Sequence, residues 1–341
     1  MIFADCLNGL GDLLAKKAQL DVKDTYLRSL AGKMPNLLLN SRSVNTSKKY
    51  MSYFNKFVNF MNKYDKSSLP ASAVLVSLFI VHLIEHNTSY GVVCSYVYAI
   101  KWMNNLHGYT DPTLSPNVKD LVLTSRRTVH KSRCKKDTLS PVTIRSLFEK
   151  YSETDNLFVI RDLAMIITCF TGFLRYDEMS NIKCKDLSFN TTYVTIHIAK
   201  SKTDQFRDGN EVLLSKIDSP ACPYSALTKY VKAFNVDLSS PNFLFRAMYS
   251  VKGKSDLRHK MKRLSYTRTR ELILSRLHEV APVGCNIGLH SLRASGVSAA
   301  ASSGVEERCF KRHGRWQSNA VHGYIKESIE SRLSVSQQLG L

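Results

Sequence analysis

His290-Ser-Leu-Arg293, His313-Gly-Arg-Trp316 and Tyr324 follow one another within one short stretch near the carboxyl terminus. An arginine donates to two phosphate oxygens at once through its planar fork, and imidazole and indole groups add directed N–H donors. A phenol can act as a nucleophile that forms a covalent intermediate. Such a set is unusual for an ordinary core and suits the surroundings of a phosphodiester.

The rest of the chain is strongly basic. Its 341 residues include 48 Lys and Arg against 28 Asp and Glu, a net charge of +20, and the excess is present on both sides of residue 136. This balance predicts a polyanionic partner, nucleic acid first, with a merely soluble basic protein as the alternative. Hydrophobic residues make up 44%, which excludes wholesale disorder, and the length predicts two domains.

The cysteines and the apolar segments indicate the compartment. None of the eight Cys lies at a metal-ligand spacing such as Cys-x-x-Cys, so we expect reduced thiols. The first residues lack the basic start of a signal peptide. The most apolar run, 71–84, is shorter than the ~20 residues of a membrane span. We therefore expect a soluble, intracellular protein.

Helical periodicity dominates the first part of the chain. Residues 1–41 are expected to form an N-terminal helical extension, for example Leu7 to Leu20. Residues 42–136 are expected to form an all-helical domain, whose aromatic stripes are better explained by a core than by a ligand cage. Its predicted helices cover Ser43–Tyr64, with Asn45 or Thr46 as the cap, Leu69–His86, a segment from Ser89 and a segment from Pro116.

A basic run, Arg126 to Lys136, ends this domain. Such a run is usually a solvated face or a nuclear-localisation patch, and here it could equally lie along a DNA backbone. The candidate DNA-binding residues in it are Arg126, Arg127, Lys131, Lys135 and Lys136.

The remaining residues, 137–341, are expected to form a second domain of mixed structure. Helices are predicted from Pro141, capped by Ser140, and over Leu157–Phe170, where Thr171-Gly172 breaks the pattern. Residues 193–199 alternate with period two and predict a β-hairpin with a returning strand at 211–214 and a short strand near Leu187. The fold class is therefore mainly α with a small antiparallel β-sheet.

A dense group of cations lies between Val251 and His278, and interspersed leucines predict a basic amphipathic helix there. Among its possible partners, a nucleic-acid groove agrees best with the charge of the whole chain. The candidate DNA-binding residues here are Lys260, Lys262, Arg263, Arg268 and Arg270.

The order of these motifs resembles the tyrosine recombinase (phage integrase) family. The first box of that family resembles Thr171-Gly-Phe-Leu-Arg175-Tyr-Asp-Glu178, which has one extra residue before the arginine. Its hairpin lysine resembles Lys202, and its second box, His-x-x-Arg, resembles His290-Ser-Leu-Arg293. Trp316 resembles the third position, for which His313 is the rival, and Tyr324 would be the nucleophile. The resemblance covers 137–341 well and the helical domain, as a core-binding domain, more loosely.

The resemblance implies an all-helical core-binding domain and a mixed catalytic domain that clamp duplex DNA. It implies catalytic roles for Arg175, Lys202, His290, Arg293, Trp316 and Tyr324, a 3′-phosphotyrosine intermediate, and no metal or other cofactor. Glu178 would be a structural partner rather than a proton carrier. The residues after Tyr324 carry an apolar stripe that either packs on its own domain or docks on a neighbouring protomer, giving a tetramer of two dimers on DNA.

Within the family, His-Gly-Arg-Trp and Cys-Pro-Tyr-Ser-Ala-Leu look most like recombinases of eukaryotic mobile elements, of the DIRS/Ngaro or Crypton type. That resemblance implies DNA integration in the nucleus. One alternative is a type IB topoisomerase, which uses the same chemistry to relax DNA. Another is a domesticated DNA-binding protein without catalysis. A metal-dependent transposase is a more distant alternative, because no acidic metal cluster is evident.

Overall fold

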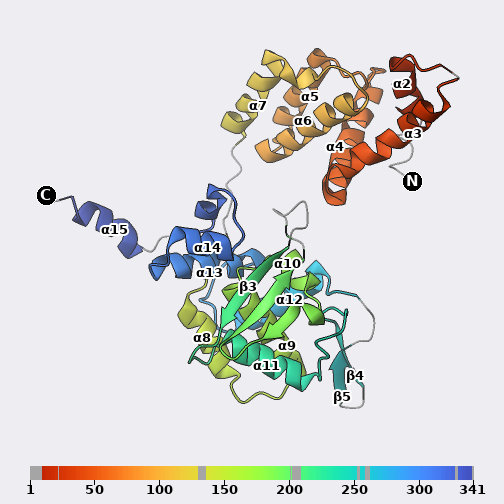
Figure 1. Ribbon diagram of the computed structural model, residues 1–341. Helices are drawn as coiled ribbons and strands as arrows, with labels where there is room; N and C mark the ends of the chain where they lie inside the picture. Colours follow the sequence, from red (N-terminus) through yellow and green to blue (C-terminus); the bar gives the residue numbers. More distant parts are fainter. Residues whose placement is uncertain are drawn as a thin grey trace. The chain divides into compact units, whose positions relative to one another are not determined.

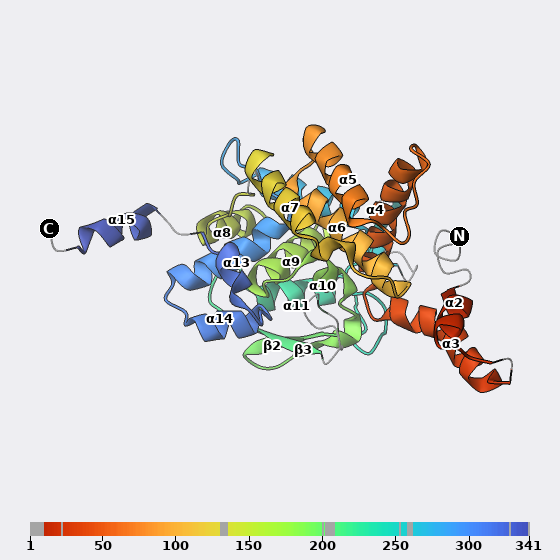
Figure 2. The same ribbon diagram turned by 90° about the horizontal axis from the view of Figure 1, so that it is seen from above.

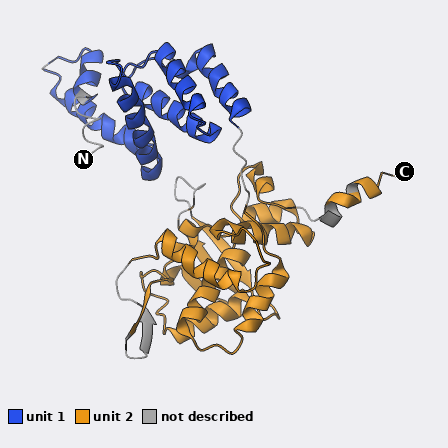
Figure 3. Ribbon diagram, turned by 180° about the vertical axis from the view of Figure 1, so that it is seen from behind, with its two compact units in different colours: residues 1–133 blue, residues 134–341 orange. Residues whose placement is uncertain are grey.

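The computed structural model describes residues 10–21, 23–129, 136–199, 201, 209–251, 254–257, 262–326 and 329–339. The chain divides into two compact units, residues 1–133 and residues 134–341 (Figure 3). Lys202 and the 131–135 part of the basic run lie outside the described residues. Because the two units are separate bodies, each is described by itself.

Unit 1 is entirely helical in its described part (Figure 1). The predicted cap of α4 is wrong: the Ser43 hydroxyl accepts from the Thr46 N–H, because Asn45 and Thr46 already lie inside the helix. Pro116 occupies the first turn of α7, where a missing N–H costs nothing. The helices are α2 (Leu10–Lys17), α3 (Thr25–Asn40), α4 (Val44–Asn62), α5 (Ala73–Glu85), α6 (Tyr90–Leu106) and α7 (Pro116–Thr128), with the 3₁₀ turn η1 (Pro112–Leu114).

The aromatic stripes of unit 1 form its core, as the periodicity predicts. Phe57 and Phe79 pack edge to face with ring centroids 5.2 Å apart, and both side chains are buried. Leu10 of α2 belongs to the same buried cluster as Phe57, so the first described helix shares the core of unit 1. Buried aromatic area of this kind is a main source of stability for a small helical unit.

Unit 2 is organised around α9 (Leu157–Thr171), a buried helix in contact with α10 (Tyr176–Asn181), α11 (Pro223–Ala233), α12 (Tyr266–His278) and α13 (Leu289–Ser302). Ser140 caps α8 as predicted, by accepting from the Thr143 N–H. The remaining elements are α8 (Pro141–Lys150), the 3₁₀ turn η2 (Cys184–Asp186), α14 (Glu307–His313), the 3₁₀ turn η3 (Asn319–Gly323) and α15 (Ile329–Gln337).

A three-stranded antiparallel sheet covers part of this core. Its order is β1 (Leu187–Phe189), β2 (Tyr193–Ile198) and β3 (Asn210–Ser215), and β2 and β3 run side by side in both views (Figures 1 and 2). Val194 and Ile196 of β2 are buried and their neighbours along the strand are not, so the alternation and the hairpin are confirmed. The predicted fold class, mainly α with a small antiparallel sheet, is confirmed as well.

The predicted basic helix from Val251 to His278 is wrong in its first half. A second hairpin is formed by β4 (Met248–Val251) and β5 (Lys254–Leu257), and the helix α12 begins at Tyr266. The reason is local: the Ser265 hydroxyl accepts from the Arg268 N–H and caps the helix at that point. None of the described helices has the length and apolarity to cross a membrane.

Candidate active site

Arg175 is positioned by the turn that joins α9 to α10. The Gly172 N–H closes α9 by donating to the Thr168 carbonyl at 3.0 Å, and Phe173, one of the two residues between Gly172 and Arg175, then takes a left-handed φ of +48°. The Arg175 backbone N–H donates to Oε2 of Glu178 at 2.8 Å, and its Nη1 donates to Oε1 at 2.7 Å. The carboxylate thus fixes both the start of α10 and the arginine side chain.

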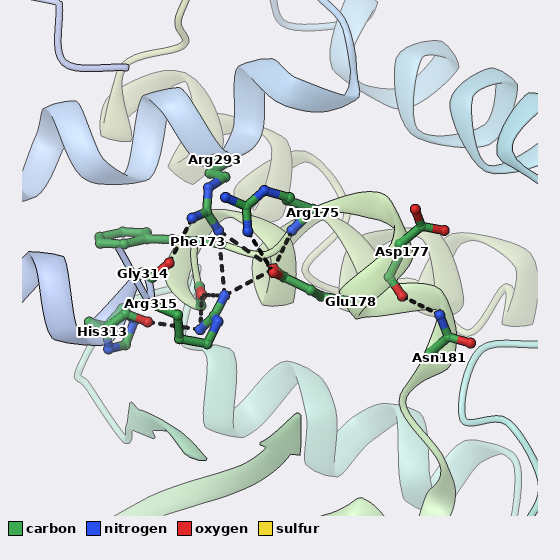
Figure 4. A network of polar contacts seen from close by, with 10 residues as sticks. Phe173, Arg175, Asp177, Glu178, Asn181, Arg293, His313, Gly314 and Arg315 are labelled. Atoms are coloured by element: carbon green, nitrogen blue, oxygen red, sulfur yellow. Dashed lines mark hydrogen bonds and ion pairs between the residues drawn. The ribbon is translucent and has the colours of Figure 1, made fainter. Parts of the chain in front are cut away.

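Arg293 reaches the same place from α13 (Figure 4). Its side chain is fully buried, with Nη2 donating to the Gly314 carbonyl at 2.6 Å and Nη1 donating to the Phe173 carbonyl. Nη1 also lies 3.5 Å from Oε2 of Glu178. The Nε–H of Arg293 is buried without a hydrogen-bond partner among the described residues.

A glycine allows α13 to approach this closely. A Cβ on Gly296 would lie 2.1 Å from the Phe170 carbonyl oxygen and 2.7 Å from the Phe173 ring. A side chain there would therefore displace the backbone that ends α9, so glycine is required by close packing rather than by its φ.

The segment after α14 adds a third guanidinium. Arg315 is only 6% exposed, and its Nη2 donates to Oε2 of Glu178 at 3.0 Å and to the Phe173 carbonyl at 3.2 Å. Its Nη1 donates to the His313 carbonyl at 2.8 Å. Glu178 therefore faces three arginines that come from three separate segments (Figure 4).

The two aromatic candidates cover Arg293. Its guanidinium carbon lies 4.0 Å from the centroid of the Trp316 ring and 5.6 Å from that of Tyr324. The two rings pack edge to face with their centroids 5.4 Å apart. The indole Nε1–H of Trp316 is buried and has no partner among the described residues. It is therefore a donor that an incoming acceptor could use.

The chain around Tyr324 is tied to α13. The hydroxyl of Ser298 donates to the Tyr324 carbonyl at 3.4 Å and accepts from the Lys326 N–H at 2.9 Å. The Tyr324 side chain is half-buried. These two backbone contacts tie the segment of Tyr324 to α13, the helix that carries Arg293.

The arginines of the cluster keep the Glu178 carboxylate ionised. Burial disfavours the Glu178 carboxylate, but Arg315, the Arg175 N–H, Arg175 and Arg293 outweigh it and hold the pKa of Glu178 below its usual value. Burial, followed by the charge of Arg175, lowers the pKa of Arg293 to about 9. Since both groups remain ionised at neutral pH, the cluster is a site of net positive charge.

His313, the rival candidate for the third donor position, contacts the turn between α9 and α10. Its Nε2–H donates to the Thr171 carbonyl at 2.7 Å, and its ring packs edge to face on Phe173, 4.8 Å between centroids. Burial, with the charges of Arg315 and Arg293, lowers the pKa of His313 despite that hydrogen bond. The imidazole is therefore neutral at physiological pH and braces the turn before Arg175.

The structure brings together Arg175, Arg293, Trp316 and Tyr324 of the six predicted catalytic residues. His290 lies exposed in the first turn of α13, one turn before Arg293. The prediction for Lys202 falls outside the described residues. Sequence reasoning missed a role for Arg315, although a charged residue between Gly314 and Trp316 within the site segment was a usable sign.

The predicted DNA-binding residues fall on both units. Arg126 and Arg127 are exposed in the last turn of α7, and Lys136 contacts the Asn286 side chain. Arg263 pairs with Asp177 at 3.1 Å, and Asp177 lies two residues after Arg175. Lys262, Arg268 and Arg270 are exposed, whereas Lys131, Lys135 and Lys260 lie outside the described residues.

Two arginines, an indole and a tyrosine are thus gathered within unit 2, a set of donors that suits a phosphate together with a group of nucleophilic type. No protein-family model matches the chain. The chain is 24% identical over 320 residues to an integrase/recombinase XerD homologue of Selenomonas ruminantium, covering 92% of this chain and 90% of the relative.

Solved structures share the fold. XerH site-specific recombinase bound to difH substrate, in a pre-cleavage complex, superposes with a TM-score of 0.57 at 15% identity, over 98% of this chain and 95% of that one. Tn1549 transposon integrase in complex with transposon right end DNA gives 0.54 at 12% identity, over 97% and 99%. The chain therefore has the fold of these recombinases and is similar in sequence to the integrase/recombinase of Selenomonas ruminantium.

Proposed function

We propose that this chain is a site-specific DNA recombinase or integrase that cuts and rejoins strands through a 3′-phosphotyrosine intermediate. The observation that carries the proposal is the position of the Tyr324 ring against the Arg293 guanidinium, 5.6 Å away, in a cluster that also holds Arg175. A nucleophile beside concentrated positive charge is the arrangement that phosphoryl transfer requires.

In the proposed reaction, the Tyr324 oxygen attacks the scissile phosphorus, a P–O bond to tyrosine forms and the P–O5′ bond breaks. Arg175 and Arg293 stabilise the charge on the non-bridging oxygens. Lys202 gives the proton to the leaving 5′ oxygen, and the phenol loses its own proton on attack. A second 5′ hydroxyl reverses the step on another strand, so the bond energy is retained.

Trp316 and His290 are the proposed additional donors. Trp316 fits this role because its indole N–H is buried without a described partner. His313 fits it less well, since its Nε2–H is already engaged by the Thr171 carbonyl. We therefore assign the third donor position to Trp316.

The proposed partner is double-stranded DNA, bound by both units. The net charge of +20 and the exposed arginines at the end of α7 support this partner. Solved structures with the same fold, XerH and Tn1549 integrase, contain bound DNA. The tail after Tyr324 is proposed to dock on a second copy, because Leu333 and Leu339 expose 52% and 65% of their surface.

We further propose that the chain serves a eukaryotic mobile element of the DIRS/Ngaro or Crypton type and acts in the nucleus. The Gly-Arg-Trp sequence at the third position supports this subtype. Excision of a marker flanked by candidate terminal repeats, measured in a cell nucleus and in a bacterial host, would test it. Equal excision of a marker that lacks the flanking repeats would contradict this proposal.

Trapping of a covalent adduct tests the main proposal. The full chain is incubated with nicked suicide DNA that carries candidate terminal repeats, and the adduct is resolved by denaturing electrophoresis. We expect a protein–DNA adduct that Tyr324→Phe abolishes while DNA binding is retained. Binding without any adduct would indicate the non-catalytic alternative, and relaxation of plasmids that lack partner sites would indicate the topoisomerase alternative.

A further inference from the structure

Arg315 adopts a backbone conformation that arginine rarely takes. Its φ is +59°, in the left-handed region that favours glycine, and its side chain is almost fully buried. A strained backbone and a buried charge are both unfavourable. They persist where the surrounding contacts compensate for them, and strained residues of this kind gather at functional sites.

The Arg315 side chain contacts the first box of the site at Gly172, Phe173 and Glu178. Its Nη2 binds the carboxylate of Glu178 and the carbonyl of Phe173, at 3.0 and 3.2 Å. Phe173 lies two residues before Arg175, and its carbonyl also accepts from Arg293. Arg315 thus anchors the acceptors that hold Arg175 and Arg293, while the aromatic rings of Trp316 and Tyr324 cover Arg293.

A count of charges shows what this contact does. Arg175 and Arg293 each carry a positive charge, and Glu178, which pairs with both, carries a negative one. Without a further cation, Glu178 would offset one of the two charges that face the phosphate. The guanidinium of Arg315 adds a third cation to that carboxylate, at 3.0 Å against 2.7 Å for Arg175 and 3.5 Å for Arg293.

We propose that Arg315 is a positioning residue that compensates the charge of Glu178, so that Arg175 and Arg293 both keep their charge for the transition state. The pentacoordinate phosphorane carries more negative charge than the bound phosphodiester, so this compensation acts on the cleavage rate more than on DNA affinity. The proposal rests on the proposed strand-transfer function.

The test compares Arg315→Gln, Arg315→Lys, Glu178→Gln and the double variant Arg315→Gln with Glu178→Gln, all in the full chain. Single-turnover cleavage of the nicked suicide DNA is measured together with DNA affinity and thermal melting. We expect Arg315→Gln to cleave about 100-fold more slowly with nearly unchanged DNA affinity. Arg315→Lys, which keeps the charge, should retain most of the rate.

The double variant separates charge from structure. Because it removes one positive and one negative charge, it should cleave about 10-fold faster than Arg315→Gln alone. A double variant that melts normally and cleaves no faster than Arg315→Gln would overturn the proposal. So would a folded Arg315→Lys as slow as Arg315→Gln, an undiminished rate in Arg315→Gln, or failure of both single Arg315 variants to fold, which would make the residue a folding determinant only.

The wild-type adduct distinguishes this proposal from the proposed function. If the wild-type chain binds the DNA and forms no adduct, the strand-transfer function itself is wrong. A second outcome is that the wild-type chain forms the adduct while both Arg315 variants fail to fold, or while the double variant cleaves no faster than Arg315→Gln. In that case only the charge compensation is wrong.

Discussion

Arg293 lies beneath Trp316, with its guanidinium carbon 4.0 Å from the centroid of the indole ring. The Tyr324 ring completes the cover at 5.6 Å, and the donors of Arg293 point to the Gly314 and Phe173 carbonyls. A cation held against aromatic faces is stabilised where water is excluded. A phosphate can therefore reach Arg293 only when this aromatic cover shifts, and the nucleophile is part of the cover.

Trp316 fluorescence should report this shift. The chain contains two tryptophans, and replacing the buried Trp102 of unit 1 with Phe leaves Trp316 as the single emitter. We expect saturating cognate DNA to change the intensity and wavelength of its emission, because the 7% exposed indole gains a polar partner. The background variant Trp102→Phe with Trp316→Phe gives the control. Unchanged emission while anisotropy shows bound DNA would contradict the shift.

Gly296 should tolerate no side chain. A Cβ at this position would lie 2.1 Å from the Phe170 carbonyl oxygen, so Gly296→Ala must displace the end of α9 and the turn that carries Arg175. Overpacking of this kind costs about 1–3 kcal/mol of unfolding free energy, and we expect adduct formation to fall with it. Gly323→Ala is the matched control for stability, since nothing lies within 4 Å of its added Cβ. Equal denaturant midpoints for the two variants would show that the close approach is not rigid.

Much of the site could be predicted because its residues lie in short motifs that follow one another in a fixed order. The resemblance of the ordered motifs to the tyrosine recombinase family implies Arg175, Arg293, Trp316 and Tyr324, and the fold brings these four residues together. The hairpin of β2 and β3 was predictable for a similar reason, since alternation of Val194 and Ile196 with polar neighbours is a local property.

The position of Arg315 between Gly314 and Trp316 marks it as a candidate, but its pairing with Glu178 could not be predicted, because that pairing depends on tertiary structure. Three arginines share one carboxylate only after α10, α13 and the segment following α14 meet, and no local pattern fixes that pairing. The left-handed φ of Arg315 could not be predicted from the sequence either, because glycine is the residue expected in that conformation. The start of α12 was misplaced because the basic residues before Ser265 are compatible with helix and strand alike.

Arg126 and Arg127 should contribute to the salt dependence of DNA binding. Each phosphate contact that is lost lowers the slope of log K against log salt by about 0.9, so Arg126→Gln with Arg127→Gln should reduce the slope by about 2. Lys101→Gln in the same unit is the control, because Lys101 pairs with Asp111 at 2.9 Å. Affinity measured by fluorescence anisotropy across a salt series gives both slopes. If the slope stays unchanged in the double variant, the end of α7 does not lie on the DNA backbone.

The exposed leucines of the tail should act in assembly and not in DNA binding. Leu333→Asp with Leu339→Asp introduces charge where an apolar partner surface is expected, so complexes of several copies on two-site DNA should weaken by about 10-fold or more. Binding of a single copy to one site should persist. Gln337→Asp places a charge on the same exposed helix and is the matched control. Light scattering of the protein–DNA complexes distinguishes the outcomes, and equal assembly of all variants would leave the tail without this role.

His313 should make the stability of the chain depend on pH below neutrality. Burial, then the charges of Arg315 and Arg293, lowers its folded pKa beneath the unfolded value of ~6.5. The unfolded chain therefore binds more protons between these two pKa values, so the contribution of His313 to stability falls as the pH is lowered through that window. Thermal melting of the wild type and of His313→Gln, whose amide can still donate to the Thr171 carbonyl, isolates this contribution from those of other histidines. We expect the wild type to lose stability relative to the variant as the pH falls from 7 toward 5. If the difference in melting temperature between wild type and variant stays constant with pH, the pKa of His313 is the same in the folded and the unfolded chain.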